Sequence, residues 1–269
     1  MKHGLGSKIY VMAVLLFAHI PMFILITFSF NKSRSRSHWT GFTFTWYNKL
    51  LHNSEILQAA LNTLVVAVVV SVVATVLGTV SAVGMYFLSK RLQNVMTILT
   101  NLPIVNPEIV TGVSLMLMFT FLKFNMGFET LILAHVISNV PYVVFSVLPK
   151  LKQMDRHLCD VAMDLGCGWL QVFFKVILPE ISPGVLSGFL IVVAFSLDDF
   201  VISYFTSGPT SQTLPLAIFA MTRKRVSPEI NALSTIIFMI ALIIIFAMQY
   251  REFQGVKAKQ SHARKGQGS

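Results

Sequence analysis

Three carboxylates, Glu108, Asp198 and Asp199, lie inside long apolar runs of the sequence that contain no Lys or Arg. A charged side chain at the centre of a bilayer costs on the order of 2.5 to 3.5 kcal/mol on insertion scales, so such groups normally face a cavity or a partner. A cationic substrate, or protonation, is the simplest compensation. Linear polyamines suit this requirement because methylene stretches separate their charges and tolerate apolar walls. The alternative is that the acids accept hydrogen bonds from neighbouring helices or from a partner subunit.

The positions of Glu108 and Asp198 predict a similar depth in the membrane. Each follows the inner end of its apolar run by a similar distance, and a rise of about 1.5 Å per residue places both roughly 18 to 20 Å deep. Pro103 and Pro107 stand just before Glu108, so we expect the third apolar helix to bend or break there. Broken helices at mid-membrane typically line a pathway.

The fourth apolar run, which follows the run that contains Glu108, carries polar residues at helical spacing. His135, Asn139 and Tyr142 occupy positions i, i+4 and i+7 in the fourth apolar run and form one polar stripe. Such a stripe is either a hydrogen-bonding seam between helices or the lining of a pathway.

The fifth apolar run carries a second stripe. Ser196, Asp199 and Ser203 would share one face of a continuous helix. Asp198 would then point about 100° away from Asp199, so at most one of the two is expected to look straight into a pathway.

Apolar segments must position these groups. Of the 269 residues, 55% are hydrophobic and 12% charged, against about 25% charged in a typical soluble domain, which predicts an integral membrane protein. About 20 residues cross the hydrocarbon core. We expect an all-α fold with residues 1–8 and a basic tail, 251–269, flanking a membrane domain over 9–250. Its six predicted transmembrane helices are Ile9–Phe30, Ala60–Leu88, Val95–Leu122, Phe128–Leu148, Gly184–Ser207 and Asn231–Tyr250.

Charge distribution predicts the orientation and excludes some functions. With both termini inside, the inner segments hold 13 of the 21 Lys and Arg residues, in line with the positive-inside tendency. The formal charge of +10 is therefore explained by membrane topology, and no nucleic-acid partner is expected. The motifs of phosphate loops, zinc proteases and serine hydrolases are absent from the sequence, so we expect neither catalysis nor a metal in this chain. Cys159 and Cys167 are expected to be free cytoplasmic thiols.

The first outer loop, Asn31–Ala59, is rich in aromatic residues, among them Trp46. One interpretation is an aromatic belt at the level of the lipid headgroups. The other is an outer lid whose rings meet a cationic solute through cation–π contacts, each contributing roughly 0.5 to 2 kcal/mol. Trp46 is the candidate for that role.

The segment from residue 155 to 183 is the longest polar-tolerant stretch between apolar runs. Its spacing predicts two short helices that meet at Gly166, the first capped by Asp155 and the second closed by Leu178 and Pro179. One interpretation is an amphipathic connector that lies flat on the membrane surface.

The same segment resembles the EAA loop of ABC importer permeases, whose pattern is roughly E-A-A, then a Gly, then I-x-L-P. The chain differs from it at two positions, with Asp160 for the Glu and Val161 for the first Ala. Further segments, including FSLDDFVISYFTSGP and VSPEINALSTI, resemble the permease subunits of spermidine/putrescine ABC importers. The positions that carry the loop resemblance are Asp160, Ala162, Gly166, Ile177, Leu178 and Pro179.

The resemblance implies a type-I importer (MetI-like) fold in a bacterial cytoplasmic membrane. It also implies a second homologous permease, two ATPase subunits that bind ATP and Mg, and an extracellular polyamine-binding protein. This chain would carry no cofactor. The implied substrate path is Glu108, Asp198, Asp199, Trp46, Tyr142 and Asn139, with Asp199 in a path or gate-holding role and Trp46 as an outer gate. The implied coupling residues are Asp160, Ala162, Asp164, Gly166, Leu178 and Pro179.

Other functions compete with polyamine import. A permease for ferric ion, thiamine or a phosphonate would share the fold, because similarity of fold does not choose a substrate. The three acids disfavour an anionic solute. A proton-coupled secondary transporter could use Glu108 as a relay, but it would be expected to show an internal repeat, and the sequence shows none.

Overall fold

The computed structural model describes residues 5–33, 38–155, 157–224, 228–240 and 242. The chain divides into two compact units. The first comprises Met1–Ser54 with Ala220–Ser269, and the second is Glu55–Phe219. The predicted basic tail, 251–269, lies outside the described residues.

Helices make up the regular structure of the described residues, as the sequence predicts for an all-α fold. Four of them are long and apolar enough to cross a membrane, and one bent pair would make a fifth span. The sixth predicted span, Asn231–Tyr250, is described only in part, and its first residues belong to a helix over Pro228–Ile240. A count of six spans is therefore not established. The four are Lys8–Ser29, Ser54–Tyr86, Phe128–Gln153 and Trp169–Asp198.

In the first unit, α1 (Leu5–Ser29) is followed by a loop and the short α2 (Thr45–Leu51). Trp46 on α2 is 5% exposed, and its indole Nε1–H donates to the carbonyl oxygen of Asn31 at 2.7 Å. The Lys49 ammonium lies 5.1 Å from the centre of the Trp46 ring. Trp46 is thus a buried residue of this unit with a hydrogen-bond partner of its own.

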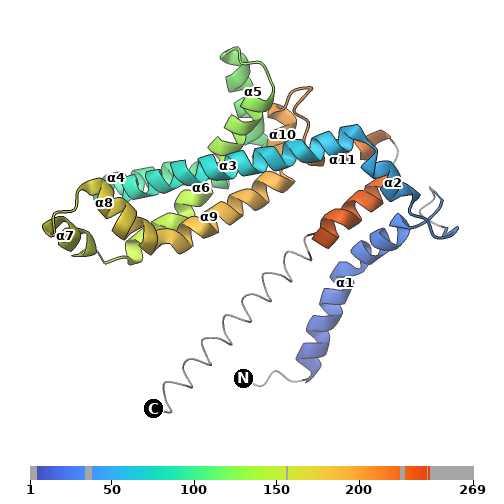
Figure 1. The fold of residues 1–269 in the computed structure, drawn as a ribbon, viewed down its shortest axis with the longest axis horizontal. Coiled ribbons are helices and arrows are strands. Elements are labelled where there is room, and N and C mark those ends of the chain that lie inside the picture. The colour runs from blue at the N-terminus through green and yellow to red at the C-terminus, as the bar shows by residue number, and fades with distance from the viewer. Residues whose placement is uncertain (1–4, 34–37, 156, 225–227, 241, 243–269) are drawn as a thin grey trace. The chain divides into compact units, whose positions relative to one another are not determined.

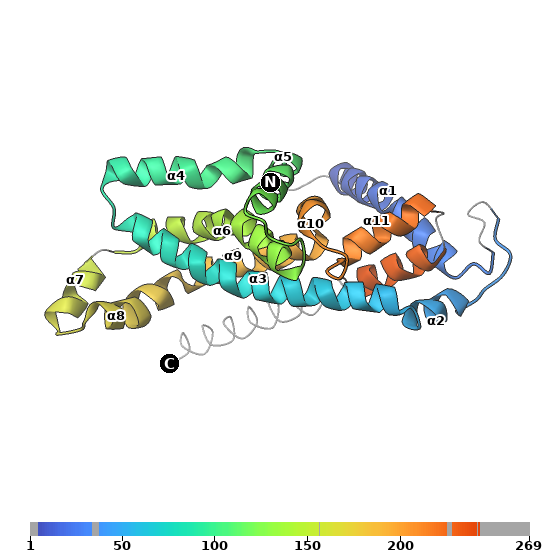
Figure 2. The same ribbon diagram turned by 90° about the horizontal axis from the view of Figure 1, so that it is seen from above.

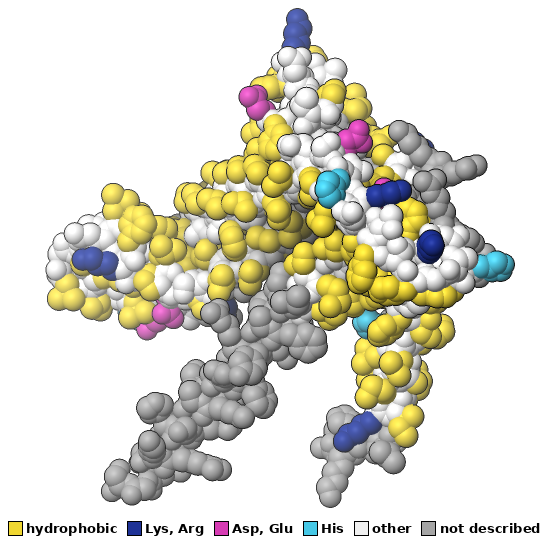
Figure 3. Space-filling model, turned by 45° about the vertical axis from the view of Figure 1, so that its right-hand side comes forward, with side chains coloured by type: hydrophobic (Ala, Val, Ile, Leu, Met, Phe, Trp, Pro, Cys, Tyr) yellow, Lys and Arg dark blue, Asp and Glu magenta, His cyan; other side chains and the backbone are white. Residues whose placement is uncertain are grey.

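The second unit is built on three long helices, α3 (Ser54–Tyr86), α6 (Phe128–Gln153) and α9 (Leu178–Asp198), which run alongside one another in Figures 1 and 2. One side of α3 is buried, with Val66, Val70 and Ala74 each 0% exposed. Its opposite side exposes Val68 and Val72, and hydrophobic side chains cover much of the surface in Figure 3. A helix apolar on both sides is typical of a membrane span that faces protein on one side and lipid on the other.

Small residues bring α6 and α9 close together. A Cβ atom added to Gly184 would lie 2.9 Å from the carbonyl oxygen of Ser146, and one added to Gly188 would lie 3.2 Å from the Cα of Val143. These two glycines of α9 are four positions apart, which is the spacing that lets membrane helices approach closely. The close approach of α6 and α9 therefore depends on the two glycines having no side chain.

The third apolar run is broken, as the prolines predict. It forms α4 (Lys90–Val105) and α5 (Glu108–Phe121), which are bent by 102°. Asn106 takes an extended conformation, with ψ 140°, because the ring of Pro107 disfavours a helical conformation in the residue before it. Glu108 consequently becomes the first residue of α5.

The segment between α6 and α9 begins as expected. Helix α7 (His157–Asp164) starts where the Asp155 carboxylate accepts a hydrogen bond from the His157 backbone N–H at 3.0 Å. Gly166 has φ +85°, a conformation that glycine adopts without strain, and it ends the turn after α7. The sequence prediction of a helix, a glycine turn and a second helix is confirmed to this point.

The predicted end of the second helix at Leu178 and Pro179 is wrong. The chain runs on from α8 (Trp169–Val172) through a π-helical turn, η1 (Phe173–Ile177), into α9. Pro179 lacks the N–H that would bond to the carbonyl of Lys175, and its ring would crowd that carbonyl. The wider π turn contains Lys175 and accommodates the proline without ending the helix.

Candidate functional site

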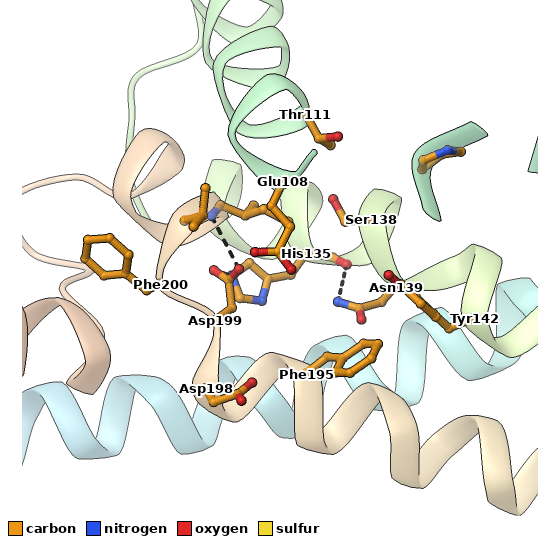
Figure 4. Close-up of a pocket in the computed structure, with 13 residues that line it drawn as sticks. Glu108, Thr111, His135, Ser138, Asn139, Tyr142, Phe195, Asp198, Asp199 and Phe200 are labelled. Carbon is orange, nitrogen blue, oxygen red and sulfur yellow. Dashed lines mark hydrogen bonds and ion pairs between the residues drawn. The ribbon is translucent and has the colours of Figure 1, made fainter. Parts of the chain in front are cut away.

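A pocket of about 220 Å³ lies within the second unit and gathers most of the predicted path residues. It is formed where α5, α6 and the end of α9 meet the short helix α10 (Val201–Thr206), and Figure 4 shows its side chains. The lining residues are Pro103, Glu108, Thr111, His135, Ser138, Asn139, Tyr142, Phe195, Asp198, Asp199, Phe200, Val201 and Ile202.

Glu108 reaches the pocket because of the break before it. The side chain extends from the first turn of α5 into the pocket (Figure 4). The unpaired N–H groups of a helix N-terminus stabilise a carboxylate by about 0.3 to 1 kcal/mol. Within the described residues, the Glu108 carboxylate makes no hydrogen bond or ion pair, so its charge is available to a ligand.

The predicted continuous helix over Gly184–Ser207 is wrong, because α9 ends at Asp198. Asp199 is extended, with φ −61° and ψ 123°, and α10 begins two residues later. The cause is local, since the Asp199 carboxylate accepts hydrogen bonds from the backbone N–H groups of Ile202 at 3.3 Å and Ser203 at 2.7 Å. Aspartate favours such caps over helix interiors because its side chain competes for nearby backbone groups.

The two adjacent aspartates therefore have different surroundings. Asp199 is half-buried and also lies 3.2 Å from the Nε2 atom of His135. Asp198 is exposed to the pocket and, among the described residues, has no hydrogen-bond or ion-pair partner. It is also the last residue of α9, where the unpaired carbonyl groups of the helix favour cations.

The polar stripe predicted on α6 lies along one wall of the pocket. Asn139 is 5% exposed and its side-chain amide donates to the carbonyl oxygen of His135 at 2.8 Å. The ring of Tyr142 packs edge to face on Phe195 at a centroid distance of 4.7 Å. The hydroxyl of Ser138 is buried in this wall and has no hydrogen-bond partner among the described residues.

The lining combines three carboxylates with no Lys or Arg. Such a site can attract and hold a cation between carboxylates and aromatic faces. The described residues contain no group of three or more His, Cys, Asp or Glu side chains that could hold a metal ion. The lining is suited to binding a cation.

The remaining predicted residues are not part of this pocket. Trp46 belongs to the first unit. The predicted coupling residues lie on α7, in the glycine turn after it and at the start of α9. Leu158 and Val161 on α7 are 46% and 55% exposed, and Leu165 just after α7 is 80% exposed. Exposed apolar side chains of this kind are typical of surfaces that contact a partner or lipid.

Sequence reasoning missed several pocket residues. Phe195 carried no signal, because an aromatic residue in an apolar run is ordinarily a packing residue. Ser138 could have been found, since it neighbours Asn139 on the polar side of α6. His135 was recognised as part of the stripe, but its bonds to the region around Asp199 depend on the break after Asp198, which the periodicity did not predict.

The fold and this pocket define a class, a multi-pass helical membrane protein that gathers polar residues around broken helices. The family model of the binding-protein-dependent transport system inner membrane component matches residues 74–254. Spermidine/putrescine transport system permease protein PotC of Escherichia coli K12 is 36% identical over 240 residues, which cover 89% of this chain and 91% of that protein. Putrescine transport system permease protein PotI of the same organism is 36% identical over 261 residues, covering 93% and 92%. The chain belongs to this family of inner-membrane transport permeases.

Solved structures share the fold at low identity. A chain of a bacterial ABC transporter involved in the import of the acidic polysaccharide alginate matches with a TM-score of 0.69 and 16% identity, over 93% of this chain and 99% of that one. A chain of an amino acid ABC transporter matches with a TM-score of 0.55 and 15% identity, over 78% and 99%. These proteins show an ABC importer permease fold and leave the solute open.

Proposed function

We propose that this chain is a membrane-spanning subunit of an ATP-driven importer of polyamines such as spermidine and putrescine. Two lines of support converge. Relatives that are 36% identical over most of the chain bear the names of spermidine/putrescine permeases. The pocket joins three carboxylates with aromatic rings and has no Lys or Arg in its lining, and this second observation carries the proposal because it matches the chemistry of a polycation.

Side chains of this chain bind the charged and the apolar parts of the solute separately. Glu108 and Asp198 bind ammonium groups, and the rings of Tyr142 and Phe195 pack against the methylene stretch between them. Asn139 supplies a neutral polar group on the same wall. Asp199 holds the gate region. Within the first unit, Trp46 supports the outer gate as a buried residue that anchors its loop through the carbonyl of Asn31. Binding is reversible and no covalent step takes place on this chain.

The energy for transport comes from a partner. Two ATPase subunits bind ATP and Mg, and they dock on the exposed apolar patch of α7 through Asp160, Asp164 and the neighbouring loop. Closure of the ATPases shifts the permease between inward-open and outward-open states. Ala162, Gly166, Leu178 and Pro179 shape this coupling loop.

The assembly also includes a second, homologous permease and an extracellular polyamine-binding protein. A structural neighbour was crystallised with an alginate pentasaccharide-bound periplasmic protein, which supports an outer docking partner for this chain. Both termini then lie in the cytoplasm of a bacterial cell, consistent with the 13 basic residues of the inner segments.

The test is uptake of labelled spermidine by vesicles that hold the whole importer, comparing the native chain with Asp198→Asn and Glu108→Gln. Both changes keep side-chain size and remove the charge. We expect each to lower kcat/KM for spermidine at least tenfold while assembly and ATPase activity persist, because a lost charge-assisted contact contributes about 1.5 to 3 kcal/mol. Ser187→Ala, at an exposed site of α9, is the matched control. Unchanged uptake by both acid variants would show that these acids do not bind the solute.

A further inference from the structure

One imidazole joins both sides of the break between α9 and α10. His135 on α6 is 1% exposed. Its Nδ1 atom lies 3.2 Å from the hydroxyl of Ser196 on α9, and its Nε2 atom lies 3.0 Å from the hydroxyl of Ser203 on α10. The same Nε2 atom lies 3.2 Å from the carboxylate of Asp199, in the break itself. Three groups on two helices and their linker are thus held by one ring of a third helix.

The partners of the ring show which of its nitrogens faces a carboxylate. The Asp199 carboxylate already accepts two backbone N–H groups, so it acts as an acceptor and the His135 Nε2 atom carries the hydrogen. The Ser196 hydroxyl lies within hydrogen-bond distance of Nδ1 and can pair with it as donor or acceptor. The Asn139 side chain, which donates to the His135 carbonyl, adds a contact within α6.

This arrangement removes Asp199 from the set of carboxylates that a solute can use. Asp199 has three donors around it, whereas Asp198 and Glu108 line the same pocket with no hydrogen-bond or ion-pair partner among the described residues. Loss of His135 would leave the Asp199 carboxylate, whose side chain is 11% exposed, with only its two backbone N–H donors, and a largely buried carboxylate with too few donors is costly. The break between α9 and α10 would also lose its link to α6.

We propose that His135 is a positioning residue, which fixes the break between α9 and α10 and holds Asp199 so that Asp198 faces the solute together with Glu108. This inference rests on the polyamine-import function proposed above. Its role differs from that of a packing residue, because it depends on one N–H donor aimed at Asp199. The structure provides the variants that separate the two roles.

The first test compares His135→Gln with His135→Leu in the assembled importer. The Gln amide can still donate to Asp199, whereas Leu fills a similar volume without a donor. We expect His135→Leu to lower kcat/KM for spermidine about tenfold and His135→Gln to restore most of it. Ser196→Ala should give a smaller loss, with Ser187→Ala as its control on the same helix. Equal losses for Gln and Leu would overturn the proposal.

A double-mutant cycle with Asp199→Asn tests the named partner. If His135 acts through Asp199, the double variant His135→Leu with Asp199→Asn should be no worse than the poorer single variant, because the neutral Asn no longer needs the donor. Multiplicative losses, on the order of a hundredfold in the double variant, would show that the two residues act independently and would contradict the proposal.

A labelling measurement tests the geometry without any solute. In purified complexes that lack the native thiols, Asp198→Cys is reacted with a cationic methanethiosulfonate reagent, with Ser187→Cys as the reference position. We expect His135→Leu to change the rate at position 198 about fivefold or more, leaving position 187 unchanged and His135→Gln near the native rate. Should native vesicles move no polyamine, the proposed function fails while this measurement still decides the positioning role. An unchanged rate at position 198 in His135→Leu would overturn it.

Discussion

Gly208 follows α10, and its substitution tests the packing that holds this helix to the turn before α6. A Cβ atom added there would lie 2.1 Å from the backbone oxygen of Met126, 2.8 Å from its carbonyl carbon and 3.0 Å from the Cα of Gly127. Ordinary van der Waals contact begins at 3.4 Å, so Gly208→Ala requires two backbone segments to separate by about 1.3 Å. Neither side has a flexible side chain that could move aside.

The cost can be estimated from comparable overpacking. Inserting a methyl group into a tightly packed site typically costs about 1 to 3 kcal/mol, and a clash between backbones belongs at the upper end. For a chain of this size that corresponds to a fall in unfolding midpoint of about 4 °C or more. Uptake should fall as well, because the segment after α10 shifts with the break that carries the aspartates.

The assay is thermal unfolding of the purified importer in detergent, followed by the loss of the intact complex on size-exclusion chromatography. Gly84→Ala is the control, because a Cβ there meets no atom within 4 Å and α3 gains a better helix former. A Gly208→Ala midpoint within about 1 °C of the native protein would refute the reasoning. A fall in both variants would show that the assay does not report this contact.

Three further predictions concern Gly166, Trp46 and Cys159. Gly166→Ala should weaken both the stimulation of ATPase activity by solute and the coupling of ATP hydrolysis to uptake. The reason is that a residue with a Cβ is strained by about 1 to 2 kcal/mol at φ +85°. Equal stimulation in Gly166→Ala and native vesicles would contradict this. Trp46→Phe should destabilise the complex by at least about 1 kcal/mol in thermal unfolding, since it removes the buried indole donor and leaves a smaller aromatic ring in its place. An unchanged midpoint would show that the indole and its hydrogen bond are dispensable. Burial, and to a smaller extent the charge of Asp160, raise the pKa of the Cys159 thiol. Its thiolate fraction therefore stays low at pH 8 and rises only at a higher pH than for an ordinary thiol. Maleimide labelling followed by mass spectrometry should therefore modify Cys159 more slowly than the more exposed Cys167 at pH 8, and faster modification of Cys159 would contradict the burial.

Apolar length and breaker residues made much of the fold predictable. The start of α6 at Phe128, the break at Pro107 and the glycine turn at Gly166 follow from local rules that act within a few residues, whereas α6 continues to Gln153, past the predicted end at Leu148. The continuation of the helix past Pro179 did not follow from these rules, because a single π turn can relieve a proline clash that usually ends a helix. The spacing of residues in the sequence does not distinguish such a π turn from the end of a helix.

The candidate site was predictable in its chemistry and less so in its geometry. Glu108 and Asp198 were predicted to share a depth, and they line one pocket. The difference between Asp198 and Asp199 was not predictable from a helical wheel, because the carboxylate of Asp199 itself creates the break that separates them. The role of each residue in binding a solute stays a prediction until variants are measured.

The most direct test of polyamine import is accumulation of labelled spermidine in proteoliposomes that contain the native chain with its second permease and its ATPase, with the binding protein outside. The account predicts uptake that requires ATP inside and is abolished by excess unlabelled spermidine but not by thiamine, ferric ion or a phosphonate. Accumulation of one of those solutes without spermidine uptake, in an assembled complex that hydrolyses ATP, would contradict it.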